Sequence, residues 1–329
     1  EAVHRETKLP GAVLARVASS HIRVGTFQLF ASRGELDALQ RLADYTIARH
    51  DPDLVGAPDR YLQLLQRVVE RQARLIAQWM SVGFVHGVMN TDNMVVSGET
   101  IDYGPCAFLD VYHPRKVFSS IDHGGRYAFG NQPGMAQWSL ARFAESLLDL
   151  IAPGDADAAV NLASAVVNGF PALYRVVFLA RMRAKLGLTI EQEEDGDLVT
   201  ALFQAMAEAE VDFTLFFREL GNALAEGRES VVAGGAEAAS LRDWLGRYRQ
   251  RLAQEPMPDA ERARAMNAVN PAIIPRNHRV EAALGAAIEG DLAPFDALLA
   301  ALRTPFSPHA EFSLPPPADF GPYRTFCGT

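Results

Sequence analysis

The feature that most constrains the fold is a junction at Gly83, where a long apolar stripe gives way to a loop of polar residues. Apolar residues in the stripe recur three, four or seven positions apart: Leu62, Leu65, Val69, Ile76 and Trp79. That spacing places them on one face of a helix, and glycine interrupts such a pattern. The sequence therefore predicts an amphipathic helix over residues 58–80 that ends at this loop.

The loop runs His86-Gly87-Val88-Met89-Asn90-Thr91-Asp92-Asn93, and Asp102-Tyr103-Gly104 follows nine residues after its end. A His, an Asn seven positions later and then Asp, an aromatic residue and Gly match the order of the catalytic and metal-binding loops of protein kinases. The kinase base, an Asp two positions after the His, is replaced here by Val88. The pattern indicates a nucleotide–metal site in which the usual base is missing.

Two oxygen-bearing side chains of this stretch suit a divalent cation. Asn93 offers a neutral amide oxygen and Asp102 an anionic one, and Mg²⁺ or Mn²⁺ held by such a pair keeps positions free for phosphate oxygens. Asx and Gly are also the commonest turn residues, so each motif taken alone favours a turn. Their order and the β-type segments between them favour the metal site.

Asp92 is the best candidate base, because it neighbours a proposed metal ligand and could accept a proton from an incoming hydroxyl. The alternative is that it supports the ligands or caps a helix. His86 is predicted to order the loop, and Tyr103 to be an aromatic packing residue.

Arg16 and Arg23 stand seven positions apart in a β-branched segment. Guanidinium groups can bind phosphate oxygens bidentately. From their spacing alone, these two arginines are more simply interpreted as surface residues.

Composition excludes several classes of partner. The chain carries 31 basic and 40 acidic residues, a net charge of −9, without a long basic run, which argues against nucleic acid and anionic membranes as partners. No apolar stretch is long enough to span a membrane, because Arg175, Arg181 and Arg183 interrupt the most apolar one. Two cysteines, Cys106 and Cys327, do not make a disulfide framework, so a reducing, cytoplasmic location is expected.

Secondary structure is predicted to be mainly helical. Residues 34–48 also read as amphipathic helix, and two short β-type segments, Met94–Val96 and Thr100–Ile101, flank the turn Ser97-Gly98. Residues 103–134 are rich in Gly, Pro, Asp and His and predict an ordered functional loop. Helical periodicity then runs from 135 to about 302. The expected breaks are residues 152–154, the solvated acidic stretch 191–197, Gly234-Gly235 and residues 270–275.

Four segments closely resemble the selenoprotein O family over nearly the whole chain. They are Pro10–Gly25, His86–Asp110, Gly125-Arg126-Tyr127 with Asn131-Gln132-Pro133, and the terminal Phe-Cys-Gly-Thr. The resemblance implies a protein-kinase-like fold that binds ATP in a flipped orientation and transfers AMP to protein Ser, Thr or Tyr hydroxyls. It also implies Asp92 as proton acceptor, Asn93 and Asp102 as Mg²⁺ ligands with Asp102 also at the nucleotide, and Arg16 and Arg23 on the triphosphate.

The implied fold class is α+β and predominantly α: a kinase-like C-terminal lobe with a short β-hairpin at the catalytic loop and further helices. Residues 1–33 would be an inter-lobe segment, 34–186 the helical lobe and 187–329 a family-specific region. No Gly-rich phosphate loop is found, so we expect the N-terminal lobe to precede residue 1 and this chain alone to be inactive. Some relatives pair the tail cysteine with one in the loop after Asp-Tyr-Gly, where this chain has Phe118.

Two other functions stay open at this point. Ordinary phosphoryl transfer is disfavoured by Val88, since kinases place Asp there. A catalytically dead pseudokinase scaffold is disfavoured by Asp92, Asn93 and Asp102 together, because a scaffold needs no metal site.

Overall fold

The computed structural model describes residues 2–4, 8–10, 13–228 and 238–326. Its α-helices are α1 (Val24–Ser32), α2 (Leu36–His50), α3 (Arg60–Val82), α4 (Gln132–Ser146), α5 (Leu148–Ile151), α6 (Ala156–Asn168), α7 (Phe170–Leu186), α8 (Asp195–Glu208), α9 (Phe213–Glu226), α10 (Ala239–Leu252), α11 (Asp259–Val269), α12 (Asn277–Ile288) and α13 (Ala293–Leu302). Two-residue strands β3 (Phe84–Val85) and β4 (Ala107–Phe108) pair antiparallel, as do β1 (Ala2–His4) and β2 (Lys8–Pro10). The prediction of a predominantly helical chain with little strand is confirmed.

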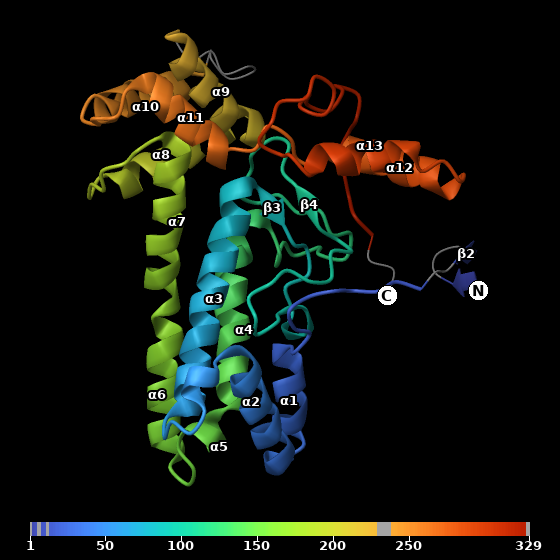
Figure 1. The fold of residues 1–329 in the computed structure, drawn as a ribbon, viewed down its shortest axis with the longest axis vertical. Coiled ribbons are helices and arrows are strands. Elements are labelled where there is room, and N and C mark those ends of the chain that lie inside the picture. Colours follow the sequence, from blue (N-terminus) through green and yellow to red (C-terminus); the bar gives the residue numbers. More distant parts are fainter. Residues whose placement is uncertain (1, 5–7, 11–12, 229–237, 327–329) are drawn as a thin grey trace.

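Helix α3 is the centre of the fold. It packs against α7, α4 and α6, and these long helices stand side by side in Figure 1. Leu65, Val69 and Ile76 of the predicted stripe are buried on it. The helix ends at Gly83, whose φ of 75° is the left-handed conformation that glycine adopts at helix ends. The predicted helix and its end are confirmed.

The predicted hairpin between Met94–Val96 and Thr100–Ile101 is wrong. Residues 94–96 instead pair with residues 22–24: the Val24 N–H donates to Met94 O at 2.9 Å and the Val96 N–H to Ile22 O at 3.0 Å. Thr100 and Ile101 do not pair with residues 94–96, because they form hydrogen bonds with α3 and with the loop that begins at His86. The Thr100 hydroxyl accepts a bond from the Trp79 indole at 2.9 Å, and Ile101 O accepts one from His86.

Most of residues 103–131 is irregular, as predicted, with β4 and the 3₁₀ turn Phe129–Asn131 inside it. Helices then follow with breaks at residues 152–155 and 270–276, which agrees with two of the expected ones. Gly234-Gly235 lies outside the described residues.

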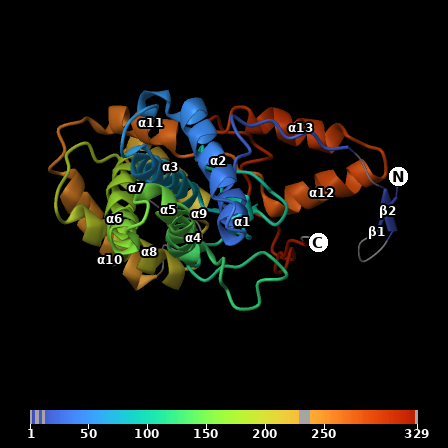
Figure 2. The ribbon, with the colours of Figure 1, turned by 90° about the horizontal axis from the view of Figure 1, so that it is seen from below.

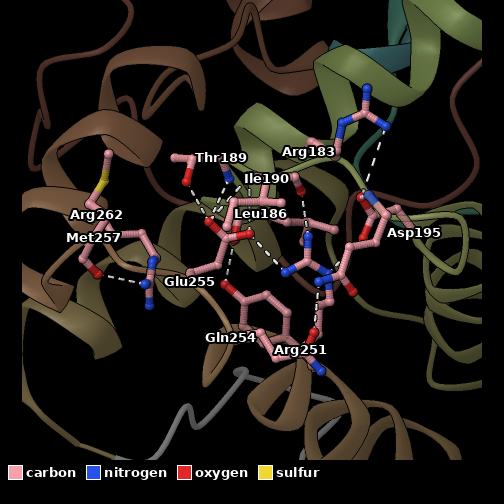
Figure 3. Close-up of polar contacts among 12 residues, drawn as sticks. Arg183, Leu186, Thr189, Ile190, Asp195, Arg251, Gln254, Glu255, Met257 and Arg262 are labelled. Carbon is pink, nitrogen blue, oxygen red and sulfur yellow. Dashed lines mark hydrogen bonds and ion pairs between the residues drawn. The ribbon is translucent and has the colours of Figure 1, made fainter.

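The acidic stretch 191–197 is not a solvated loop throughout. Asp195 begins α8 and is 1% exposed, and the Arg251 Nε donates to its carboxylate at 2.8 Å. Figure 3 shows Arg251 of α10 also reaching Glu255 and Ile190 O, while the hydroxyl and amide of Thr189 bond to Glu255. This network of buried charges, which the sequence pattern does not reveal, fastens α10 to the end of α7 and the start of α8.

Helices α12 and α13 lie to one side of the helical bundle (Figures 1 and 2). They share a small apolar cluster with the loop before α12 and the segment after α13: Ala272, Ile273, Ala283, Leu298, Ala301 and Phe312. Arg276, next to the start of α12, is 1% exposed. It bonds to Asp110 at 2.7 Å and Asp212 at 2.6 Å, so it ties α12 to the loop that follows β4.

One helical stretch, Ala156–Leu186 (α6 and α7), is long and apolar enough to cross a membrane by length and composition alone. Its most apolar window has a mean hydropathy of 1.5, and 17% of that window is buried. The expectation that its arginines rule out such a segment therefore does not hold on these criteria. A single such helix is weak evidence for a membrane span, because core helices of soluble proteins can pass the same test.

Candidate functional site

His86 is the buried support of the site, as predicted. It is fully buried, and its ring stacks on Trp79 of α3 with centroids 5.3 Å apart. Ile101 O lies 2.8 Å from Nε2, and the Val88 N–H lies 3.4 Å from Nδ1. A carbonyl only accepts, so Nε2 carries the proton and Nδ1 accepts. Burial lowers the pKa of His86, which favours this neutral form and fixes Val88 relative to Ile101.

Asn93 is oriented by a short turn. The turn Thr91–Asn93 is capped by Asn90, whose side chain accepts from the Asn93 N–H at 3.1 Å. The Asn93 Nδ2 donates to Val88 O at 2.9 Å. Since the amide nitrogen is used in this way, the amide oxygen is the atom left for a ligand. The capping role that was the alternative for Asp92 is performed by Asn90.

Asp102 has a φ of 58°. A non-glycine residue in the left-handed region costs about 1–3 kcal/mol, and such residues persist only where their surroundings hold them. Its carboxylate forms ion pairs with Arg16 and with Arg23, the latter at 3.4 Å. The structure thus brings together three of the predicted site residues, which are about 80 positions apart in the sequence.

The pairing of residues 22–24 with 94–96 explains this convergence. It places the extended segment before α1 alongside residues 94–96, which directly follow the loop His86–Asn93. Upstream of it, Ser19 bonds through both its amide and its hydroxyl to Glu99, and Arg49 donates to Ser19 O at 2.5 Å. These contacts hold the segment that carries Arg16 across the site.

A cleft of about 1210 Å³ opens at these residues. Arg16, Asn93 and Asp102 line it, and its volume exceeds that of typical small-molecule pockets. Its wall also includes large apolar side chains that are exposed to solvent: Leu14, Val17, Tyr103, Ile121 and Phe326. Tyr103 is 60% exposed, so the prediction that it is a packing residue is wrong. A cleft that combines charged and apolar walls suits a ligand with both kinds of surface.

Asp92 lies on the other side of the same turn. It lines a separate hollow of about 590 Å³ with Gly25, Thr26 and Arg142. A Cβ built on Gly25 would stand 2.0 Å from Asp92 Oδ1, so the carboxylate lies against the first turn of α1, where negative charge is favoured. It makes no hydrogen bond or ion pair with another described residue. Asp92 is therefore open to a group that enters from this hollow.

The donor set fits a magnesium ion that is shared with phosphate. No group of three or more His, Cys, Asp or Glu that could hold a metal occurs among the described residues. Mg²⁺ bound with phosphates needs only one or two protein carboxylates, the rest being phosphate and water oxygens. Asp102 and Asn93, on the same cleft, match that requirement.

Two residues near the site were missed by sequence reasoning. Gln132, at the start of α4, is fully buried and accepts from the His86 N–H at 3.0 Å while donating to Phe84 O at 2.9 Å. Thr325 bonds to Pro105 O at 2.8 Å. Gln132 lies in a segment singled out for the resemblance, which was the available signal, whereas Thr325 stands one residue before the terminal Phe-Cys-Gly-Thr and had no such signal. Cys327 lies outside the described residues, and burial raises the pKa of the Cys106 thiol to about 11.

Comparisons with known proteins give the class of enzyme. The chain is 54% identical over 334 residues to a "Protein nucleotidyltransferase YdiU" of Bradyrhizobium sp. strain BTAi1, covering all of this chain and 68% of that protein. It is 53% identical over 331 residues to the protein of the same name from Agrobacterium fabrum, covering 99% and 68%. The chain is therefore a nucleotidyltransferase that spans about two thirds of these relatives. Residues 1–303 match the family described as "Protein adenylyltransferase SelO", and the chain belongs to that family.

Proposed function

We propose that the protein transfers AMP from ATP to Ser, Thr or Tyr hydroxyls of other proteins, on a lobe built like the C-terminal lobe of a protein kinase. The observation that carries this proposal is the division of the loop 90–93. Asn93 faces the large cleft with Asp102, while Asp92 faces the separate hollow. A nucleotide in the cleft and a hydroxyl in the hollow would meet at this turn.

The cleft provides charge for the triphosphate. Arg16 and Arg23 are already at Asp102, and a Mg²⁺ or Mn²⁺ ion held by Asn93 and Asp102 would neutralise phosphate charge. ATP binding then requires both arginines to exchange the Asp102 carboxylate for phosphate oxygens. Guanidinium groups bind carboxylates and phosphates with equally suitable geometry, so each arginine exchanges one charged hydrogen-bond partner for another.

Asp92 is the proposed base. It takes the proton of the acceptor hydroxyl as that oxygen forms a bond to the α-phosphorus, and the bond from the α-phosphorus to the bridging oxygen breaks. Pyrophosphate leaves and the protein carries AMP. With the α-phosphate at the point of attack, a base at the position of Val88 is not needed.

Replacing Asp92 by Asn is expected to lower the rate of AMP transfer by about 10²–10⁴-fold, the usual contribution of a general base. The Kd for ATP should stay within about twofold of the wild-type value, because Asp92 does not line the cleft. Transfer is measured with α-labelled ATP and Mg²⁺, and the Kd by calorimetry.

Glu145→Gln is the matched control, since Glu145 lines the same hollow and pairs with Arg142. It should retain most of the transfer rate. An Asp92→Asn variant with an unchanged rate would show that the base is another group. These assays use the protein at its full natural length, because we infer that the 329 residues alone, which have no Gly-rich phosphate loop, bind ATP weakly.

A further inference from the structure

The C-terminal tail crosses the loop that follows Asp102. Thr325 is 6% exposed and pairs with Ser119 in a parallel bridge. Its N–H donates to Phe118 O at 2.9 Å, and its carbonyl accepts from the Ser120 N–H at 2.9 Å. The tail ahead of it is also anchored: the Tyr323 hydroxyl donates to Glu281 of α12 at 2.7 Å. The position of Thr325 is thus fixed by its backbone and by α12.

The Thr325 side chain makes a third contact, with the site itself. Its hydroxyl donates to Pro105 O at 2.8 Å, three residues after Asp102. On the other side of Asp102, Ile101 O accepts from His86 at 2.8 Å. The strained Asp102 backbone is therefore held by one side-chain hydrogen bond before it and one after it, and a strained residue needs such support.

Pro105 also touches the catalytic loop. A Cβ built on Gly87 would stand 2.6 Å from Pro105 O, so this carbonyl lies tightly between Gly87 and the Thr325 hydroxyl. Gly87 has a φ of 87°, which only glycine adopts readily. A shift of Pro105 would therefore displace both the loop that carries Asn93 and the loop that carries Asp102, the two proposed metal ligands.

The last described residue of the tail lies at the cleft. This residue, Phe326, lines the cleft together with Tyr103, Pro105 and Ile121, and it is 66% exposed. The buried Thr325 thus holds an exposed phenylalanine on the wall of the cleft.

We propose that Thr325 is a positioning residue of the nucleotide site: its hydroxyl, through Pro105 O, holds Asp102 in the conformation that binds metal and phosphate. The inference rests on the proposed function for its ligand, MgATP. The C-terminal tail then helps to build the cleft. This role goes beyond anchoring, because the two backbone contacts with residues 118–120 would be enough to anchor the tail.

The test compares Thr325→Val, which keeps the shape and removes the hydroxyl, with Thr325→Ser, which keeps the hydroxyl. Thr304→Val is the matched control, since the Thr304 hydroxyl makes only a local 3.5 Å contact with Ala301 O. The probe is Mg²⁺ with an ATP analogue that cannot be cleaved between the α- and β-phosphates. The Kd comes from calorimetry, and hydrogen exchange is followed at the amides of residues 101–106.

We expect Thr325→Val to weaken MgATP-analogue binding by about three- to tenfold, the loss of one hydrogen bond, and to speed exchange over residues 101–106. Thr325→Ser and Thr304→Val should match the wild type in both. Faster exchange with an unchanged Kd would mean that the tail only anchors the loop, and it would overturn the proposal. An unchanged exchange rate together with an unchanged Kd would overturn it as well.

A failure of the proposed function would give a different result in the same binding experiment. In that case the wild-type protein itself would not bind the analogue. The exchange rates of residues 101–106 in Thr325→Val would still test whether the Thr325 hydroxyl holds this segment: unchanged rates overturn that role, and faster rates support it.

Discussion

Replacing Asp102 by Ala is expected to lower AMP transfer by at least about 10³-fold. The carboxylate is the only anionic group of the proposed metal pair, and metal-borne charge stabilisation is worth several kcal/mol in a transition state. The substitution also leaves Arg16 and Arg23 without the carboxylate they pair with. Transfer is followed with α-labelled ATP, and metal affinity by titration with Mn²⁺.

The loss has a particular signature. Two freed arginines should still attract the triphosphate, so ATP without metal is expected to bind Asp102→Ala at least as well as the wild type, while Mn²⁺ affinity falls. Asp53→Ala, a change in an exposed ion pair with Arg67, is the control and should leave both unchanged. Retention of the wild-type transfer rate by Asp102→Ala would contradict the assigned role.

Replacing Arg276 by Ala is expected to destabilise the fold by about 3–5 kcal/mol, the cost of removing one partner from a buried ion pair. Arg276 is 1% exposed and serves both Asp110 and Asp212. Burial raises the pKa of Asp212, and the charge of Arg276 opposes that rise. The free energy of unfolding is measured in urea, with melting temperature as a second reading.

The pH dependence of this loss distinguishes its cause. Without Arg276 the pKa of Asp212 should rise further, so protonation relieves the unpaired charge and the destabilisation should shrink as the pH falls from 7 towards 5. Arg67→Ala removes an exposed pair, 45% and 62% exposed at its two side chains, and should cost about 0–1 kcal/mol. Equal losses in the two variants would refute the importance assigned to the buried network.

Local patterns predicted the elements well and their partners poorly. The 58–80 stripe gives a helix because helical spacing is a property of neighbouring residues. The β-type segment 94–96 does form a pairing, yet its partner is residues 22–24 rather than 100–101. Extended segments show which residues favour pairing, but the partner depends on contacts made elsewhere, here by Trp79 and His86.

The site shows the same division. The motif indicated Asn93 and Asp102, and the structure places both on one cleft. Its spacing could not show that Asp92 faces a different hollow, because adjacent residues in a turn can point in opposite directions. Arg23 reaches Asp102 through the pairing of residues 22–24 with 94–96, and Arg16 through the contacts of Ser19 with Glu99 and Arg49. Sequence spacing encodes neither. Burial of Asp195 likewise depends on Arg251, 56 residues further on.

The most direct measurement supplies the full natural protein with Mg²⁺, a soluble protein extract as acceptor, and ATP labelled at either the α- or the γ-phosphate. The account predicts incorporation into protein from α-labelled ATP only, lost in Asp102→Ala. Incorporation from γ-labelled ATP only would mean phosphoryl transfer, and no incorporation from either would favour a binding scaffold. Either result would contradict AMP transfer by this site.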